Sequence, residues 1–529
     1  MKYVDSLPQP VQMREHVIIE MPDGVKLSAR IWMPEDAETN PVPAVLEYIP
    51  YRKRDFTSTR DFTMHPYVAG HGYACVRVDI RGSGESEGVL TDEYLELELT
   101  DGEAVLRWIA EQPWCDGKVG MIGISWGGFN GLQLAARRPP ELRAVISVCS
   151  TDDRYADDVH YMGGCLLGDN QSWAAAMLSS TSLPPDPRLV GDEWRAMWLA
   201  RLEQSGWWLE QWLAHQRRDD YWRHGSICER YADVEVPVFL VSGWADGYSN
   251  SIFRMLTHLK GPRKGLIGPW SHKYPHLGKP GPAIGFLQEV VRFWDRWLKD
   301  VDNAADADPM LRVWMQDPAP PTMYYERRSG RWVGERSWPS PNIEERRYTL
   351  GRGGLVREGR PVKARKLTIQ SPLSVGAFAG KWCSFSATPD LPHDQREEDG
   401  GALVFQSVRL AEPIEILGAV EVDLVFESNQ PVAMIAARLS SVFPDDRATR
   451  ITYGLFNLTH REGHHAPKAL EPGKTYRVTV RLNEIAQVVE AGQRLRLSLS
   501  TSYWPIAWPP PRPARLSILT SESTLRVPV

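Results

Sequence analysis

Two different hydrophobic periods divide the chain into an N-terminal and a C-terminal part. In the N-terminal part, short and nearly continuous apolar runs at residues 43–48 and 73–79 are followed by segments with helical spacing. Such runs are typical of strands that are covered on both faces, and strands that alternate with helices form a parallel sheet. We therefore predict a parallel α/β sheet, with further strands at residues 119–124, 144–148, 238–241 and 265–267.

Local signals place other elements around this sheet. Two apolar runs within residues 16–33 flank the tripeptide Pro-Asp-Gly at residues 22–24. A glycine-containing turn between β-rich segments predicts an antiparallel hairpin. Thr100 and Glu103 have the spacing of a capping box, which predicts that a helix begins at Thr100. Apolar side chains at helical spacing across residues 284–299 predict a helix that ends the N-terminal part.

The predicted sheet is interrupted once, between residues 151 and 233, and this segment is predicted to form a helical cap. Its aromatic side chains either line an apolar substrate pocket or build the core of a small helical insertion, and the sequence leaves both interpretations open. We take Trp173 as a candidate substrate contact. The segment carries seven of the 21 tryptophans: Trp173, Trp194, Trp198, Trp207, Trp208, Trp212 and Trp222.

Beyond a polar stretch at residues 300–308, the hydrophobic period falls to two. Apolar residues alternate with polar ones at 420–426, 476–482 and 495–499. Because this period is typical of half-buried strands, and turns with Gly and Pro separate the runs, we predict an all-β sandwich of jelly-roll type. The predicted boundaries are 1–150 and 234–305 for the two parts of the α/β domain, 151–233 for the cap and 306–529 for the sandwich.

Composition narrows the class of protein. Of 529 residues, 42% are hydrophobic and 24% charged, and the formal net charge is -6, as in an ordinary globular protein. This balance favours neither nucleic acid nor an acidic membrane surface, so a small molecule or a short peptide is the expected partner. The six cysteines include no C-x-x-C pair, which argues against a disulfide framework and a zinc site. No cofactor is indicated.

A cytoplasmic location is expected, because residues 1–14 contain no apolar core of the length that a signal peptide needs. The longest uncharged stretch, residues 119–136, contains five glycines. It therefore predicts a buried strand, turn and helix rather than a membrane span. The large β surface permits contacts in a homo-oligomer, although no residue pattern requires them.

The clearest chemical signal is the G-x-S-x-G motif at residues 123–127, which follows an apolar strand and precedes a helix. Its glycines allow a sharp turn that presents Ser125 above the sheet, at a helix N-terminus whose partial positive charge favours an anion. A dinucleotide fingerprint is excluded, because no glycine triplet after a strand has G-x-G-x-x-G spacing. Ser125 is therefore a candidate nucleophile.

A serine hydroxyl needs a histidine to accept its proton and a carboxylate to orient that histidine. Asp246 follows the strand at residues 238–241, at the sheet edge where α/β enzymes place their sites. His272 follows the next strand, so the chain order is Ser, Asp, His. His276 is the nearest competitor for the role of the base.

Two donors are expected to stabilise the tetrahedral oxyanion. The backbone N–H of Trp126, the residue after the nucleophile, is one of them. The other is expected after an early strand, where a hydroxyl of Tyr48 or Tyr51 reaches the site or packs as an ordinary aromatic side chain. Spacing does not distinguish these two tyrosines.

Five ordered segments together resemble the family of bacterial cocaine esterase, α-amino acid ester hydrolases and X-prolyl dipeptidyl peptidases. They are PYRK at 50–53, DIRGSGESEG at 79–88, GISWGG at 123–128, GWADG at 243–247 and GPWSH at 268–272. The resemblance spans most of the chain and implies an α/β-hydrolase domain with a helical cap, followed by a jelly-roll domain.

The same resemblance implies roles for particular residues. Ser125 is then the nucleophile, Asp246 and His272 form its relay, and the Tyr51 hydroxyl with the Trp126 N–H forms the oxyanion hole. The chain departs from the family pattern at Trp126, where members often carry Tyr, and in the proline-rich loop at residues 503–512. These departures leave the substrate open.

Four carboxylates cluster where the cap leaves the sheet: Asp152, Asp153, Asp157 and Asp158. They either bind a substrate ammonium group, as in the family's amino-ester hydrolases and dipeptidyl peptidases, or act as helix caps on a solvated face. We favour the second interpretation, and keep Asp152, Asp153 and Asp157 as candidate substrate contacts.

The sequence thus predicts a metal-independent serine hydrolase that cleaves an ester or amide of a small acyl or aminoacyl substrate through an acyl-enzyme. Dipeptidyl-peptidase or aminopeptidase action is the alternative within this class. A non-catalytic ligand-binding module on the same fold is the alternative outside it, because fold does not determine function.

Overall fold

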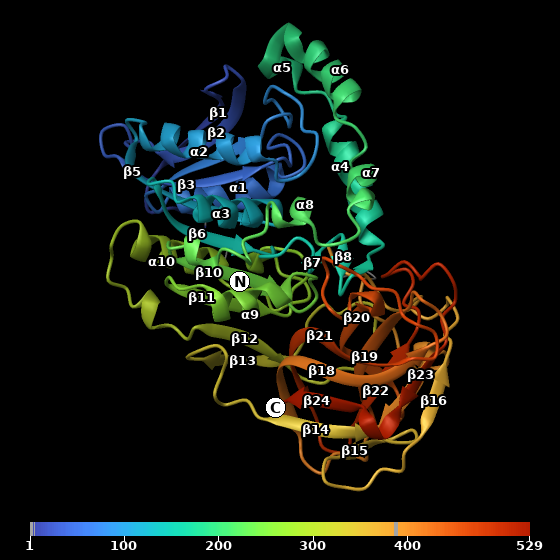
Figure 1. The fold of residues 1–529 in the computed structure, drawn as a ribbon. Coiled ribbons are helices and arrows are strands. Elements are labelled where there is room, and N and C mark those ends of the chain that lie inside the picture. Colours follow the sequence, from blue (N-terminus) through green and yellow to red (C-terminus); the bar gives the residue numbers. More distant parts are fainter. Residues whose placement is uncertain (1–3, 5, 386–389) are drawn as a thin grey trace.

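The structure, a computed structural model, describes residue 4, residues 6–385 and residues 390–529. An α/β domain and a β-sandwich lie side by side, and a helical arm extends from the first of them (Figure 1). Each helix among the described residues is too short or too polar to cross a membrane.

The α/β domain is built on a sheet with the strand order β1, β2, β4, β3, β5, β6, β10, β11, β12. The strands from β4 to β12 are parallel, whereas β1 and β2 form the predicted antiparallel hairpin. The predicted parallel sheet is confirmed. The bounds are β1 Val11–Glu20, β2 Lys26–Pro34, β3 Val42–Ile49, β4 Ala74–Asp79, β5 Cys115–Ile124, β6 Leu142–Val148, β10 Val238–Gly243, β11 Arg263–Gly268 and β12 Leu311–Gln316.

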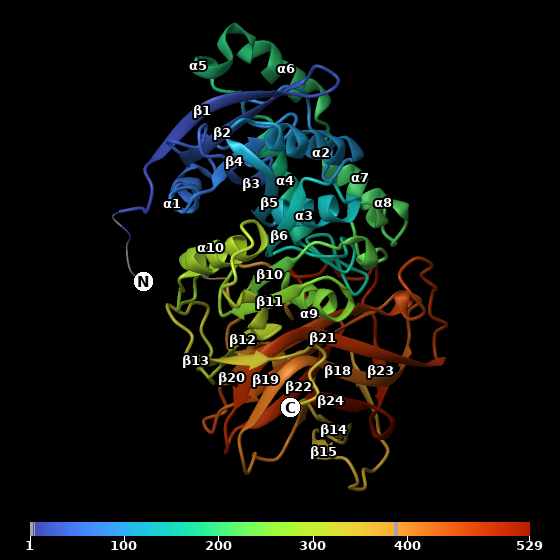
Figure 2. The same cartoon turned by 90° about the vertical axis from the view of Figure 1, so that its left-hand side faces the viewer.

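Helices cover both faces of this sheet. Figure 2 shows α1 (Ser58–Ala69) and α10 (Phe286–Trp297) on one side, with α2 (Glu96–Ala110), α3 (Trp126–Arg137) and α9 (Ser249–His258) on the other. The predicted start of α2 is wrong: the helix begins at Glu96, and no side chain caps it.

The cap lies between β6 and β10. It comprises three two-residue strands, β7 Asp157–Asp158, β8 Tyr161–Met162 and β9 Cys165–Leu166, and the helices α4 Asp169–Thr181, α5 Pro187–Val190, α6 Trp194–Gln204, α7 Trp208–Ala214 and α8 Asp220–Arg223. Trp208, Trp212 and Trp222 are buried, and Trp173 is half-buried. Trp208, Trp212 and Trp222 therefore help to build a core, whereas Trp207 is exposed, and among the seven only Trp173 lines the cavity described below.

The C-terminal part is all-β, as predicted, with two antiparallel sheets. In one sheet β18 (Ile414–Ser428) pairs with β21 (Thr475–Val489) and β24 (Thr524–Pro528). The other has the order β17 (Leu403–Gln406), β22 (Arg494–Ser500), β19 (Met434–Val442), β20 (Ala448–Asn457). Strand β12 continues the α/β sheet beyond β11, pairs antiparallel with β13 (Gly330–Glu335) on its other side, and also pairs with β21 at Gln316 and Gln487. The two parts are therefore joined through backbone hydrogen bonds.

Candidate active site

Ser125 lies at the sharp turn between β5 and α3, with φ 57° and ψ -125°. This left-handed backbone is strained for a non-glycine residue, and such strain concentrates at functional sites. The flanking glycines make the turn possible: a Cβ at Gly123 would lie 2.4 Å from the Gly127 carbonyl carbon, and a Cβ at Gly127 would lie 2.7 Å from Ile49 Cγ2. The turn presents the Ser125 side chain at the carboxyl end of the sheet.

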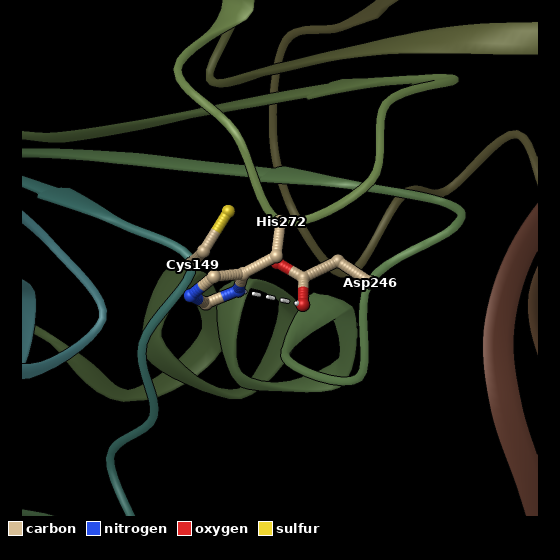
Figure 3. Close-up of side chains that lie close together, drawn as sticks. All are labelled: Cys149, Asp246 and His272. Atoms are coloured by element: carbon tan, nitrogen blue, oxygen red, sulfur yellow. Dashed lines mark hydrogen bonds and ion pairs between the residues drawn. The ribbon is translucent and has the colours of Figure 1, made fainter. Parts of the chain in front are cut away.

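Asp246 and His272 meet after β10 and β11, which are neighbours in the sheet. His272 Nδ1 lies 3.1 Å from Asp246 Oδ1 (Figure 3), and the Asp246 side chain is fully buried. Burial by itself raises the pKa of Asp246, but His272 and hydrogen bonds from Cys149 and Cys383 hold it below its ordinary value. Asp246 is therefore an ionised acceptor that orients the imidazole with Nδ1 as the donor.

Ser125 and His272 line one cavity of about 310 Å³. Its wall is largely aromatic, with Tyr51, Tyr94, Trp173, Tyr248, Tyr274 and Phe385. Asp158 is the carboxylate among its lining residues. An aromatic cavity of this size with a few polar groups is typical of a site for a small organic ligand.

Tyr51, not Tyr48, faces the serine. Burial raises the pKa of the Tyr51 phenol, while hydrogen bonding with the Ser125 hydroxyl and the Trp126 backbone N–H acts in the opposite direction. The Tyr51 ring packs edge-on against Trp126, with 6.3 Å between ring centroids. Tyr48 points elsewhere, because its hydroxyl donates to the Glu98 carbonyl oxygen at 3.0 Å.

Glu98 is a residue near the site that the sequence did not identify. Its Oε1 accepts hydrogen bonds from Trp126 Nε1 at 2.5 Å and from Asn130 Nδ2 at 2.8 Å. Burial raises its pKa to about 7, although these two hydrogen bonds oppose the rise. No sequence signal pointed to this role, because a single Glu in an amphipathic helix is common. Its hydrogen-bond partners, Trp126 and Asn130, lie on another helix, α3.

The acidic cluster divides into two groups. Asp152 and Asp157 are buried and form ion pairs with Arg254, and Asp153 pairs with Arg218 at 3.2 Å. The prediction of a solvated face is therefore wrong for Asp152 and Asp157, and also for Asp158, which is 3% exposed. Asp152, Asp153 and Asp157 do not line the Ser125 cavity, because these arginines draw them away from it.

Asp158, in contrast, faces the cavity. It accepts a hydrogen bond from the Tyr248 hydroxyl at 2.7 Å, while its Oδ2 accepts none from the described residues. Burial raises its pKa, which His160 opposes. Trp173 is held nearby by a hydrogen bond from its Nε1 to Glu93 at 3.1 Å.

His276, the competing base, is buried outside the cavity and stacks on Phe286. Burial lowers its pKa to about 4, and Arg60 adds to the effect. The ring is thus a neutral core histidine, in a poor position to receive a proton from Ser125.

A loop of the C-terminal part, which we name the 382–385 strap, packs against the site. The His272 backbone N–H donates to the Ser384 carbonyl oxygen at 2.7 Å, and Cys383 Sγ donates to Asp246 Oδ1 at 3.4 Å. Trp382 packs against Tyr248, with 5.2 Å between ring centroids. The loop that carries His272 is therefore held in place by the second domain.

Comparison with known proteins agrees with this geometry. A family model described as X-Pro dipeptidyl-peptidase (S15 family) matches residues 23–274, and one described as X-Pro dipeptidyl-peptidase C-terminal non-catalytic domain matches residues 303–526. The chain belongs to this family. The match to the X-Pro dipeptidyl-peptidase family extends over both domains, so the family prediction is confirmed.

Relatives and solved structures match this chain over most or all of its length. Cocaine esterase from Rhodococcus sp. (strain MB1 Bresler) is 26% identical over 535 residues, covering 93% of this chain and 91% of that protein. An aminopeptidase from the marine sediment archaeon Thaumarchaeota archaeon superposes with TM-score 0.79 at 19% identity, covering 100% of this chain and 98% of that one. An α-amino acid ester hydrolase superposes with TM-score 0.76 at 20% identity, covering 100% and 98%. The chain is a member of a serine esterase and peptidase family, with an α/β-hydrolase fold and a C-terminal β domain.

Proposed function

We propose that this chain is a metal-independent serine hydrolase in which Ser125, His272 and Asp246 form the catalytic triad. The observation that carries the proposal is a shared cavity: Ser125 and His272 both line it, and Asp246 holds the far nitrogen of His272 at 3.1 Å. Three stretches of chain, after β5, β10 and β11, supply the three groups.

The geometry supports an acyl-enzyme mechanism. His272 Nε2 accepts the Ser125 proton as the hydroxyl oxygen attacks the substrate carbonyl, and Asp246 stabilises the resulting imidazolium. The Tyr51 hydroxyl and the Trp126 backbone N–H donate to the oxyanion. His272 then protonates the leaving alcohol or amine, and water attacks the acyl-enzyme by the same route in reverse.

The cavity favours small acyl groups that are apolar or aromatic. Aromatic rings, including the Tyr51, Trp173 and Phe385 side chains, form a large part of the lining of this cavity, and Ile124, Val159 and Leu277 add aliphatic surface. Burial of an apolar acyl group there contributes roughly 25 cal/mol for each Å² removed from water. We therefore propose a small carboxylic ester as the preferred substrate, and an amide as the slower one.

One observation favours a second candidate, hydrolysis of aminoacyl esters or X-prolyl peptides. Asp158 presents a buried carboxylate to the cavity, and its Oδ2 has no hydrogen-bond donor among the described residues. An ammonium group of a substrate would supply the missing donor. In this case Asp158 binds the substrate ammonium group, a role for which the sequence suggested Asp152, Asp153 and Asp157 as candidates.

A substrate panel separates these candidates. It compares p-nitrophenyl esters with free-amino aminoacyl esters and prolyl dipeptide anilides, for the wild type, Asp158→Asn and the matched control Asp153→Asn. The ester proposal predicts no advantage for a free amine. A preference for the amine that Asp158→Asn removes and Asp153→Asn keeps would support the second candidate instead.

The catalytic proposal itself is tested by a fluorophosphonate label. We expect stoichiometric modification of Ser125 and none in Ser125→Ala. Failure to label folded wild-type protein would favour a ligand-binding module on this fold.

A further inference from the structure

Two buried thiols that the proposed mechanism does not use lie beside Asp246. Cys149 follows β6 and Cys383 belongs to the 382–385 strap, and both form hydrogen bonds to the Asp246 carboxylate. Cys149 is 1% exposed and Cys383 is also 1% exposed. Two thiols therefore contact the Asp246 carboxylate, and Cys383 also lines the Ser125 cavity.

Three different donor types converge at this point. Ligand atoms of Cys149, Asp246 and His272 all lie within 4.8 Å of one another, and Figure 3 shows the three side chains gathered together. Tetrahedral zinc, with bonds of about 2.0–2.3 Å, places its ligand atoms roughly 3.3–3.8 Å apart. Side-chain movements on the order of 1 Å therefore suffice to enclose an ion.

Charge distinguishes this group from two similar ones among the described residues. Glu47, Asp61 and His65 form one, and Arg60 lies 2.7 Å from Glu47. Glu93, Asp158 and His160 form the other, where Arg154 lies 2.8 Å from Glu93. Arg60 therefore already pairs with Glu47 in the first group and Arg154 with Glu93 in the second, so neither of these two glutamates is free to ligate a divalent cation.

Asp246 has no such neutralising partner. Among the described residues, His272 is the group that forms an ion pair with it, and no Arg or Lys does so. Thiolate, imidazole and carboxylate together are a donor set that Zn²⁺ and Cd²⁺ prefer over Mg²⁺ or Ca²⁺. We propose that Cys149, Asp246 and His272 form a binding site for a soft divalent cation, and that the bound ion inhibits hydrolysis.

The inhibition follows from the chemistry of the imidazole. A cation on Nδ1 takes the lone pair on the side that faces Asp246, so the neutral ring carries its proton on Nε2. Nε2 then has no lone pair to accept the Ser125 proton. Cys149 releases its thiol proton to solvent when it binds the ion as a thiolate. No electron is transferred, and water fills the fourth position.

The inhibitory half of this proposal rests on the proposed function, whereas the binding half does not. Chelator-treated full-length protein is titrated with CdCl₂ while thiolate-to-cadmium ultraviolet absorption and p-nitrophenyl ester hydrolysis are recorded together. We expect an absorption that saturates at one ion per chain, a parallel loss of activity, and reversal of both by chelator.

Cys149→Ser should abolish the absorption and raise the Cd²⁺ concentration for half-inhibition at least about 10-fold, relative to its own metal-free rate. Cys149→Ala serves if the serine variant does not fold. Cys228→Ser is the matched control, because Cys228 is half-buried and accepts a hydrogen bond from Arg218 instead. It should keep both signals.

Unchanged cadmium sensitivity in the Cys149 variants, or loss of the signals in Cys228→Ser, would overturn the site. The wild-type protein could show the saturable thiolate absorption and yet have no hydrolase activity in the absence of metal. That result would support the metal site and refute the proposed function.

Discussion

Removal of the Tyr51 hydroxyl tests the oxyanion assignment most directly. In Tyr51→Phe the tetrahedral intermediate retains the Trp126 backbone N–H and loses its other proposed donor. Loss of one such donor lowers turnover about 100- to 1000-fold, which corresponds to roughly 2.7–4 kcal/mol of transition-state stabilisation. Substrate binding should change little, because the hydroxyl acts mainly on the developing oxyanion.

The structure predicts that this variant folds. The Tyr51 ring makes edge contacts with Trp126 and Trp173, each with 6.3 Å between centroids, and phenylalanine keeps both. The lost hydrogen bonding should reduce the free energy of unfolding by no more than about 1.5 kcal/mol. A small shift in melting temperature with a large loss of kcat is therefore expected.

Stopped-flow release of p-nitrophenol measures acylation, and urea unfolding measures stability. Tyr48→Phe is the matched control, since its buried hydroxyl donates to the Glu98 carbonyl oxygen rather than to the site. It should lose about 1 kcal/mol of stability and little acylation rate. Wild-type acylation in Tyr51→Phe would refute the oxyanion role.

Three further predictions follow from the site. Asp246→Asn should lower kcat about 10⁴-fold by favouring the wrong imidazole tautomer, and unchanged pre-steady-state acylation would contradict the relay. Gly127→Ala should lower the free energy of unfolding by about 1–3 kcal/mol, measured in urea, because its Cβ would lie 2.7 Å from Ile49 Cγ2. The pKa of Glu98 is about 7 when folded and 4.5 for the free side chain, so the stability that Glu98 provides below pH 4.5 should fall by roughly 3 kcal/mol as pH rises to 7. Glu98→Gln should flatten this dependence in urea unfolding, and an unaltered slope would argue against a titrating Glu98.

Local sequence predicts the parts of the site that local structure determines. The turn at Ser125 depends on glycines within two positions of it, and Asp246 and His272 each follow a strand, so pattern and chain order were enough to name these three residues as candidates. The choice between Tyr48 and Tyr51 is different. Both end the same strand region, so spacing left the choice open and the family resemblance implied Tyr51; in the structure the Tyr48 hydroxyl donates to Glu98 instead.

The acidic cluster shows the same limit at longer range. Four aspartates within seven positions look alike in sequence, but Arg254 on α9 draws Asp152 and Asp157 away while Asp158 turns to the cavity. The prediction of where α2 begins was wrong for a related reason. The helix begins at Glu96, before the Thr100 capping pattern, and its Glu98 is buried and accepts a hydrogen bond from Trp126.

The 382–385 strap has a consequence for how this protein comes into existence. The loop that positions the imidazole is bonded to a segment more than one hundred residues further along the chain. A ribosome that has released the complete α/β sheet has therefore not yet made all of the contacts that hold the imidazole. We expect hydrolytic competence to arise late in translation, after the β domain has emerged and docked.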